Sequence, residues 1–120
     1  MDVPKGWKDD KIGPKKLLQS FEVNFFAPFA LTRYFSKAMI ERKQGWIINI
    51  CSSSSYTGGG APNHCIYAST KHALLGFSRA LDEELRLHNI RVGTISPAGV
   101  STQMMADRVD LDQSTFMSVE

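Results

Sequence analysis

The chain has 120 residues, of which 42% are hydrophobic and 22% charged, and its formal net charge is +2. This balance is that of an ordinary globular domain and excludes a disordered chain, while the charge is too small to indicate a nucleic-acid partner. No apolar run is long enough to cross a membrane, no signal-peptide pattern opens the sequence, and two sparse cysteines indicate free thiols in a reducing compartment. Their spacing and that of the histidines fit no metal site. We therefore expect one cytoplasmic domain over residues 1–120, with no membrane or nucleic-acid partner.

The first third of the chain predicts a lead-in followed by a long helix. Residues 1–16 are rich in Lys, Asp, Gly and Pro and are expected to be exposed and mobile. Apolar residues at helical spacing then predict a helix over residues 17–43, which Gly45 is expected to end. Pro28 lies inside this helix and is expected to kink it, or to break its hydrogen bonding one turn earlier, near Asn24.

The rest of the chain predicts strand, loop, helix and strand. Residues 46–51 form a short apolar run without alternation, which is typical of a parallel strand covered on both faces. The Ser- and Gly-rich residues 52–63 predict a loop, and residues 66–88 predict a helix whose buried stripe includes Ala73, Leu74, Phe77, Leu81 and Leu85. Residues 90–95 predict a second strand, and residues 104–109 a short helix.

This order indicates a βαβ unit, and therefore an α/β fold with a parallel sheet. Ligands of such sheets bind beyond the carboxyl ends of the strands. The Ser-rich loop and the Pro97-Ala98-Gly99 loop both follow strand ends. We expect a ligand site there.

Tyr67 and Lys71 are four residues apart at the start of the second predicted helix, so their side chains lie one turn apart on one face. An ammonium group beside a phenol stabilises the phenolate and lowers the phenol pKa from its ordinary value near 10. The pair therefore predicts a general acid or base at Tyr67. Alone this spacing is a weak signal, because it also occurs by chance on helix surfaces.

Four stretches in this order make the signal specific: Val23-Asn24, residues 45–52, residues 67–73 and residues 91–102. Together they resemble the short-chain dehydrogenase/reductase family. The resemblance implies a partial Rossmann-type fold, NAD or NADP as cofactor, and a small carbonyl or alcohol as substrate. By the same resemblance Tyr67 exchanges a proton with the substrate oxygen, Lys71 binds the nicotinamide ribose, and Asn24 holds a water in a proton relay.

The resemblance also implies that the segment after the second strand wraps the nicotinamide end of the cofactor. The residues concerned are Pro97, Gly99, Val100 and Thr102. The family's Pro-Gly pair is here Pro97-Ala98-Gly99, so the glycine is displaced by one place.

The serine that polarises the substrate oxygen is ambiguous. Counting 13 residues back from Tyr67 selects Ser54, whereas the strand register after Gly45 selects Ser52, which we favour because register fixes a side chain more firmly than loop length does. His64 lies near Tyr67 along the chain and is expected either to touch substrate or, more commonly for a lone loop histidine, to be incidental.

Compared with the family it resembles, the chain lacks the glycine-rich turn that binds pyrophosphate at a helix N-terminus. It therefore has the pattern of a central segment without most of the cofactor half. The alternative to an oxidoreductase is a non-catalytic fragment that acts as an interaction or oligomerisation module. In either case the two long helices are expected to drive homo-oligomerisation, as the resemblance implies.

Overall fold

The computed structural model describes residues 7–11, 13–58, 63–99, 114 and 117. The elements in chain order are α1 (Gly13–Phe21), the π-helix η1 (Glu22–Phe26), α2 (Ala27–Arg42), β1 (Gly45–Ile50), the 3-10 turn η2 (Ser53–Ser55), α3 (Cys65–Leu85), the 3-10 turn η3 (Arg86–His88) and β2 (Ile90–Ile95). The predicted helix over residues 104–109 lies outside the described residues. None of the described helices is long and apolar enough to cross a membrane.

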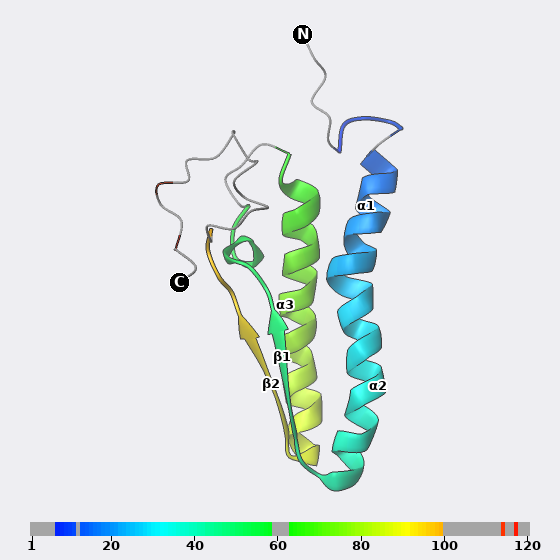
Figure 1. Ribbon diagram of the computed structural model, residues 1–120, viewed down its shortest axis with the longest axis vertical. Coiled ribbons are helices and arrows are strands. Elements are labelled where there is room, and N and C mark those ends of the chain that lie inside the picture. The colour runs from blue at the N-terminus through cyan, green and yellow to red at the C-terminus, as the bar shows by residue number, and fades with distance from the viewer. Residues whose placement is uncertain (1–6, 12, 59–62, 100–113, 115–116, 118–120) are drawn as a thin grey trace.

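The two strands pair in parallel, in a register that runs from Gly45 opposite Ile90 to Ile50 opposite Ile95. α3 connects them and runs antiparallel beside them (Figure 1). The predicted βαβ unit and parallel sheet are thus confirmed. Because the strands are parallel, both carboxyl ends lie at the same edge of the sheet.

α1, η1 and α2 form one continuous column beside α3 (Figure 1). The predicted break near Asn24 is confirmed, and it takes the form of the π-helix. The Ala27 N–H donates to the Glu22 carbonyl five residues back, and Pro28, which has no N–H, follows in the first turn of α2. The column begins at Gly13 rather than at residue 17, since Pro14 is well tolerated in a first helical turn.

The end of α2 differs from the prediction. Lys43, not Gly45, is the capping residue, and it takes a left-handed conformation with φ of 55°. The Asn89 side-chain amide stabilises this cap by donating to the Lys43 carbonyl over 3.0 Å. Gly45 is instead the first residue of β1, where a Cβ would lie 2.6 Å from the Met39 Cγ and Sδ atoms.

The core lies between α3 and the sheet. Cys51, Leu74 and Leu75 form its buried cluster, and Phe25 and Phe77 pack against it. The predicted stripe on α3 is right at Leu74 and Leu85, which are buried, while its other members are only half-buried. Thr70 and Ser78 are also fully buried, because α3 presents a hydroxyl-bearing stripe to the sheet and to η1.

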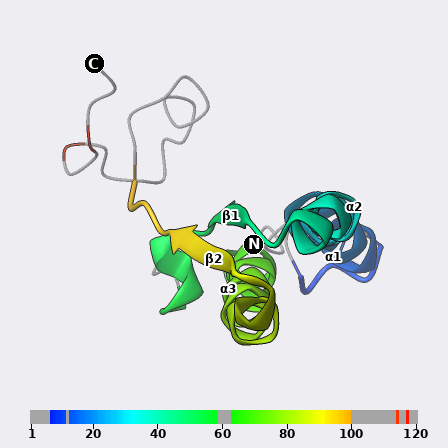
Figure 2. The ribbon, with the colours of Figure 1, turned by 90° about the horizontal axis from the view of Figure 1, so that it is seen from below.

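One face of β1 is uncovered, so the expectation of a strand covered on both faces is wrong for the described part of the chain. Trp46, Ile48 and Ile50 are 71%, 50% and 55% exposed. Figure 2 shows that α3 covers one face of the strands, while the column of α1 and α2 stands beyond β1. With α3 on one face and the column beyond the edge of the sheet, alternate residues of β1 on the other face are left exposed.

Candidate active site

The loops after β1 and β2 are joined by main-chain hydrogen bonds that continue beyond the strands. The Cys51 N–H donates to the Ile95 carbonyl over 2.7 Å, and the Ser53 N–H donates to the Pro97 carbonyl over 2.9 Å. The Ser-rich segment and the Pro97 segment therefore meet at the carboxyl edge of the sheet, where the sequence predicts a ligand site.

Tyr67 and Lys71 lie on the same face of α3 at this edge. The Lys71 ammonium nitrogen is 5.7 Å from the centre of the Tyr67 ring and donates to the Ile50 carbonyl over 3.0 Å. Because that carbonyl ends β1, the hydrogen bond ties the ammonium to the strand. Tyr67 remains 37% exposed, although the Lys71 ammonium lies beside its ring.

Burial lowers the pKa of Lys71 below its usual 10.5, and the attraction of the Cys51 sulfur opposes this shift. Burial likewise raises the pKa of the Cys51 thiol above 9.0, against the opposing influence of Lys71. Burial is the larger cause for each group, so both favour their neutral forms more than free side chains do. Burial of the Lys71 ammonium costs desolvation free energy, and a pKa perturbed in this way is common among residues of functional sites.

Asn24 reaches this turn of α3 from the π-helix. Its side-chain nitrogen Nδ2 donates to Thr70 Oγ1 over 3.1 Å, and Thr70 Oγ1 in turn donates to the Tyr67 carbonyl over 2.7 Å. The structure thus brings Asn24, Tyr67 and Lys71 together through Thr70. Thr70 was not predicted as a site residue, although it lies three residues after Tyr67 and carries a hydroxyl, which can accept and donate from one atom.

Three serines of the tight turn after β1 are buried, namely Ser52, Ser54 and Ser55. The Ser52 side chain accepts a hydrogen bond from the Ser54 N–H over 3.1 Å, and the Ser52 N–H donates to Ser55 Oγ over 3.2 Å. η2 also has a capping box, in which the Ser52 side chain accepts from the Ser55 N–H and the Ser55 side chain accepts from the Ser52 N–H. Ser54 Oγ is 3.0 Å from His64 Nε2, and the His64 ring centre is 4.9 Å from that of Tyr67.

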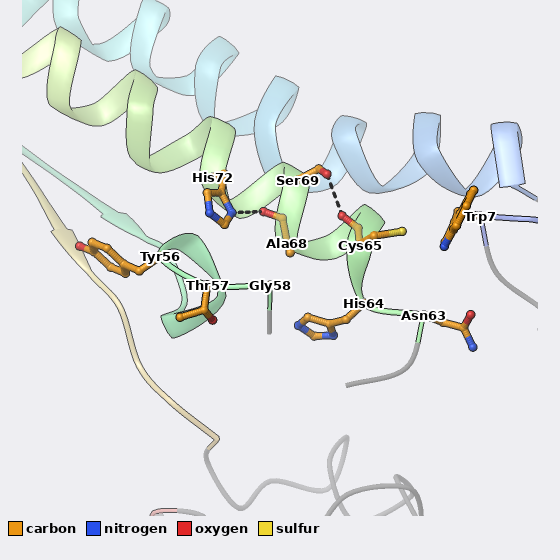
Figure 3. Close-up of a pocket in the computed structure, with 10 residues that line it drawn as sticks. All are labelled: Trp7, Tyr56, Thr57, Gly58, Asn63, His64, Cys65, Ala68, Ser69 and His72. Carbon is orange, nitrogen blue, oxygen red and sulfur yellow. Dashed lines mark hydrogen bonds between the residues drawn. The ribbon is translucent and has the colours of Figure 1, made fainter. Parts of the chain in front are cut away.

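Two hollows flank α3, and the larger one does not contain the Tyr67–Lys71 pair. It measures about 820 Å³ and is lined by Trp7, Tyr56, His64 and one stripe of α3 that includes Ser69 and His72 (Figure 3). With 3.6 residues per turn, Tyr67 and Lys71 lie roughly 130° around the helix from that stripe. The larger hollow is therefore not the one that Lys71 lines.

The smaller hollow, of about 470 Å³, lies between α2 and β1 and contains both Asn24 and Lys71. Its walls are otherwise mainly apolar, with Phe35 and Trp46 among them. A mainly apolar cleft with a few convergent polar groups is typical of a site for a small molecule.

The segment expected to wrap a cofactor is described only in part. Pro97 accepts the hydrogen bond from Ser53, and the Gly99 carbonyl accepts one from the Met117 N–H over 3.0 Å. Val100 and Thr102 lie outside the described residues.

Residues 6–112 match the family model described as short chain dehydrogenase. The chain belongs to this family. An uncharacterized oxidoreductase of Escherichia coli, YgcW, is 45% identical over 84 residues, which are 69% of this chain and 31% of that protein. The chain spans about a third of the length of the curated relatives it matches.

Solved short chain dehydrogenases share the fold. A 3-oxoacyl-[acyl-carrier protein] reductase of Brucella melitensis with bound NAD has a TM-score of 0.75 and 27% identity, and the match covers 98% of this chain and 46% of that one. A gluconate 5-dehydrogenase of Burkholderia cenocepacia in complex with NADP and tartrate has a TM-score of 0.75 and 26% identity, over 82% of this chain and 38% of that one. The expectation of a partial Rossmann-type α/β fold is therefore confirmed.

Proposed function

We propose that this chain carries the proton-transfer half of an NAD(P)-dependent oxidoreductase that interconverts a small carbonyl compound and an alcohol. The observation that supports this most directly is the placement of the Lys71 ammonium between the Ile50 carbonyl and the Tyr67 ring at the carboxyl edge of the sheet. An exposed phenol beside a cation is suited to give a proton to a substrate oxygen and to take it back.

Each side chain has a distinct role in this proposal. Tyr67 is the general acid in reduction and the general base in oxidation. Lys71 stabilises the phenolate electrostatically, and Asn24 holds the relay water that returns a proton to Lys71. The hydrogen bond from Asn24 to Thr70 supports this last role, because it keeps the π-helix against the turn of α3 that bears Lys71.

Of the two candidate serines, we propose Ser52 as the hydroxyl that polarises the substrate oxygen and keep Ser54 as the alternative. Ser52 Oγ already accepts the Ser54 N–H, so its own O–H remains to donate to another oxygen. A hydroxyl that accepts one hydrogen bond becomes a better donor of the next.

NAD or NADP is the proposed cofactor, and it supplies the hydride. The two solved relatives described above hold NAD and NADP. The residues present fit the nicotinamide end: the Lys71 ammonium has donors left after its bond to Ile50, and these can bind ribose hydroxyls. Pro97, Gly99, Val100 and Thr102 are proposed to line the same end.

We further propose that the protein is a cytoplasmic homo-oligomer whose contacts run through the long helices. Leu18, Phe26 and Tyr34 in the column of α1, η1 and α2 are 66%, 50% and 73% exposed and lie outside the smaller hollow, which leaves apolar surface uncovered. The same surface supports the second candidate function, an interaction module without turnover. Light scattering after size exclusion measures the molar mass in solution and so tests this proposal. The mass of a monomer at all protein concentrations would contradict it.

The test of the enzymatic proposal combines cofactor binding with turnover in the full chain. Isothermal titration with NADH and NADPH is expected to give saturable heat with at least one of them. With a panel of small ketones and aldehydes, Tyr67→Phe is expected to lower turnover by roughly 10²- to 10⁴-fold, as loss of a general acid does. Tyr56→Phe is the matched control, because Tyr56 is exposed and lies in the other hollow against Arg79. Binding of neither cofactor together with a stable oligomer would favour the interaction module.

A further inference from the structure

His64 joins two groups that the proposed reaction requires. It precedes the first turn of α3, with its Nε2 atom 3.0 Å from Ser54 Oγ and its ring centre 4.9 Å from that of Tyr67. In Figure 3 the ring lies below the start of α3 and is turned toward the side where Tyr56, Thr57 and Gly58 lie. The histidine therefore contacts both the serine turn and the tyrosine.

The contact with Ser54 acts on Ser52. The Ser54 N–H donates to Ser52 Oγ, and both serines are buried, at 6% and 9% exposure. A side chain that holds Ser54 Oγ therefore helps to hold in place the turn from which the Ser54 N–H donates to Ser52. That N–H occupies one lone pair of Ser52 Oγ and so helps to direct the remaining O–H toward an external acceptor.

The contact with Tyr67 acts on the other partner of the substrate oxygen. The two rings are tilted by 56° at van der Waals range, so the imidazole limits the rotation of the phenol about its χ1 and χ2 angles. His64 thereby restricts both the Tyr67 phenol and, through Ser54, the Ser52 hydroxyl. Correct alignment of two groups on one reacting atom is worth large factors in rate.

We propose that His64 is a positioning residue that aligns the Ser52 hydroxyl, through Ser54, with the Tyr67 phenol around one substrate oxygen. The catalytic role of His64 rests on the proposed function. The contacts that link His64 to Ser54 and Ser54 to Ser52 are present in the protein without cofactor or substrate. It adds a role for a side chain that the sequence suggests is incidental.

Two variants separate the hydrogen bond from the ring contact. The side-chain amide introduced by His64→Gln reaches as far as the imidazole Nε2 and can keep the bond to Ser54, whereas His64→Phe keeps a ring against Tyr67 and loses the bond. In the full chain labelled with nitrogen-15, hydrogen exchange of the Ser54 amide reports its bond to Ser52. We expect exchange to be roughly two- to tenfold faster in His64→Phe, the range for loss of one neutral hydrogen bond, and unchanged in His64→Gln.

Two further variants guard against a general loosening of the fold. Ser54→Ala removes the same contact from the other side, and the protection of the amide at position 54 should fall as it does in His64→Phe. His72→Gln is the matched control, since His72 bonds to the Ala68 carbonyl of its own helix and not to the serine turn, and should leave this amide unaffected. Equal exchange in wild type, His64→Phe and Ser54→Ala would overturn the proposal.

Turnover then tests the catalytic meaning. His64→Phe is expected to lower kcat roughly tenfold with KM changed less than about twofold, and His64→Gln to restore kcat, because the effect falls on the transition state rather than on binding. Unchanged kcat in His64→Phe would remove the catalytic role of His64. If instead Tyr67→Phe keeps full turnover, the proposed function fails, while the exchange data still decide whether His64 positions the serine turn.

Discussion

The Asn24 side chain donates a hydrogen bond to Thr70 Oγ1 over 3.1 Å, across 46 residues of sequence. This bond joins the π-helix of the first helical column to the turn of α3 between Tyr67 and Lys71. Thr70 is fully buried and passes the link on to the Tyr67 carbonyl. The helix irregularity and the proposed proton-transfer pair are therefore parts of one connected structure.

Thr70→Val should destabilise the protein by about 1–3 kcal/mol, although valine has nearly the same shape. It removes the acceptor of Asn24 Nδ2 and so leaves that part-buried amide donor unpaired, and it removes the side-chain hydrogen bond that the Tyr67 carbonyl accepts in addition to its helical one. Urea unfolding followed by circular dichroism measures the loss. Ser69→Ala is the control, because the Ser69 hydroxyl is exposed and bonds to the Cys65 carbonyl of its own helix; equal destabilisation by both variants would contradict the role given to Thr70.

Gly45→Ala should also destabilise the fold, by about 1–3 kcal/mol. A Cβ at Gly45 would lie 2.6 Å from the Met39 Cγ and 2.9 Å from its Cβ, so the end of α2 must shift away from the start of β1. Gly76→Ala is the matched comparison: its Cβ meets nothing within 4 Å in the middle of α3, and it should stabilise the helix by about 0.5–1 kcal/mol. A Gly45→Ala variant as stable as wild type would show that the Met39 side chain moves aside at little cost in free energy.

The features that could be predicted from the sequence are those that residues close together along the chain determine. The strand at residues 90–95 and the shared helix face of Tyr67 and Lys71 follow from periodicity along one element, and the break in hydrogen bonding near Asn24 follows from the missing N–H of Pro28. Each of these was correctly expected. The cap of α2 was not, because the conformation of Lys43 depends on Asn89, which lies far along the chain.

The remaining features depend on how elements pack. The bond from Asn24 to Thr70 needs the π-helix and α3 to be side by side, and the contact from His64 to Ser54 needs the loop before α3 to fold back on η2. Apolar residues on both faces of β1 correctly indicate a strand, but they do not reveal that only one face is covered by the described elements. Such facts are set by tertiary structure and leave no periodic signal.

Asp82 should make the fold sensitive to acid. Its carboxylate accepts from the Val92 N–H and from Arg86 and Arg91, and these contacts, the Val92 bond first, lower its pKa to about 2 from 3.8. The folded pKa is below the unfolded value, so the stabilisation is fully present above about pH 4 and is lost as the pH falls through about 2. The melting temperature of wild type should therefore exceed that of Asp82→Asn at about pH 5, and the difference should shrink toward pH 2.

Glu84→Gln removes a carboxylate from the exposed face of the same helix and controls for the general effect of charge. Its melting temperature should follow that of wild type over this range. A constant difference between wild type and Asp82→Asn across the acid range would contradict the assignment, since the charge of Asp82 would then not be what stabilises the start of β2.

Lys71→Met should separate stability from activity. Burial lowers the Lys71 pKa below 10.5, so the folded state disfavours the ammonium. The resulting penalty is present at neutral pH and is relieved as the pH rises through the lowered folded value toward 10.5, because only the unfolded chain is then still protonated. Methionine fills similar space without a charge and leaves the Ile50 carbonyl to water, so the variant should melt no lower than wild type at about pH 7, with the difference narrowing toward about pH 10.

Turnover of Lys71→Met should nevertheless fall by at least the roughly 10²-fold expected for losing the partner of a general acid. Thermal melts and turnover with the same panel of small ketones and aldehydes measure the two effects side by side. A variant that unfolds far more easily would show that Lys71 serves the fold. One that melts normally and keeps turnover would remove Lys71 from the proposed mechanism, because the Tyr67 phenol would then transfer its proton without the neighbouring cation.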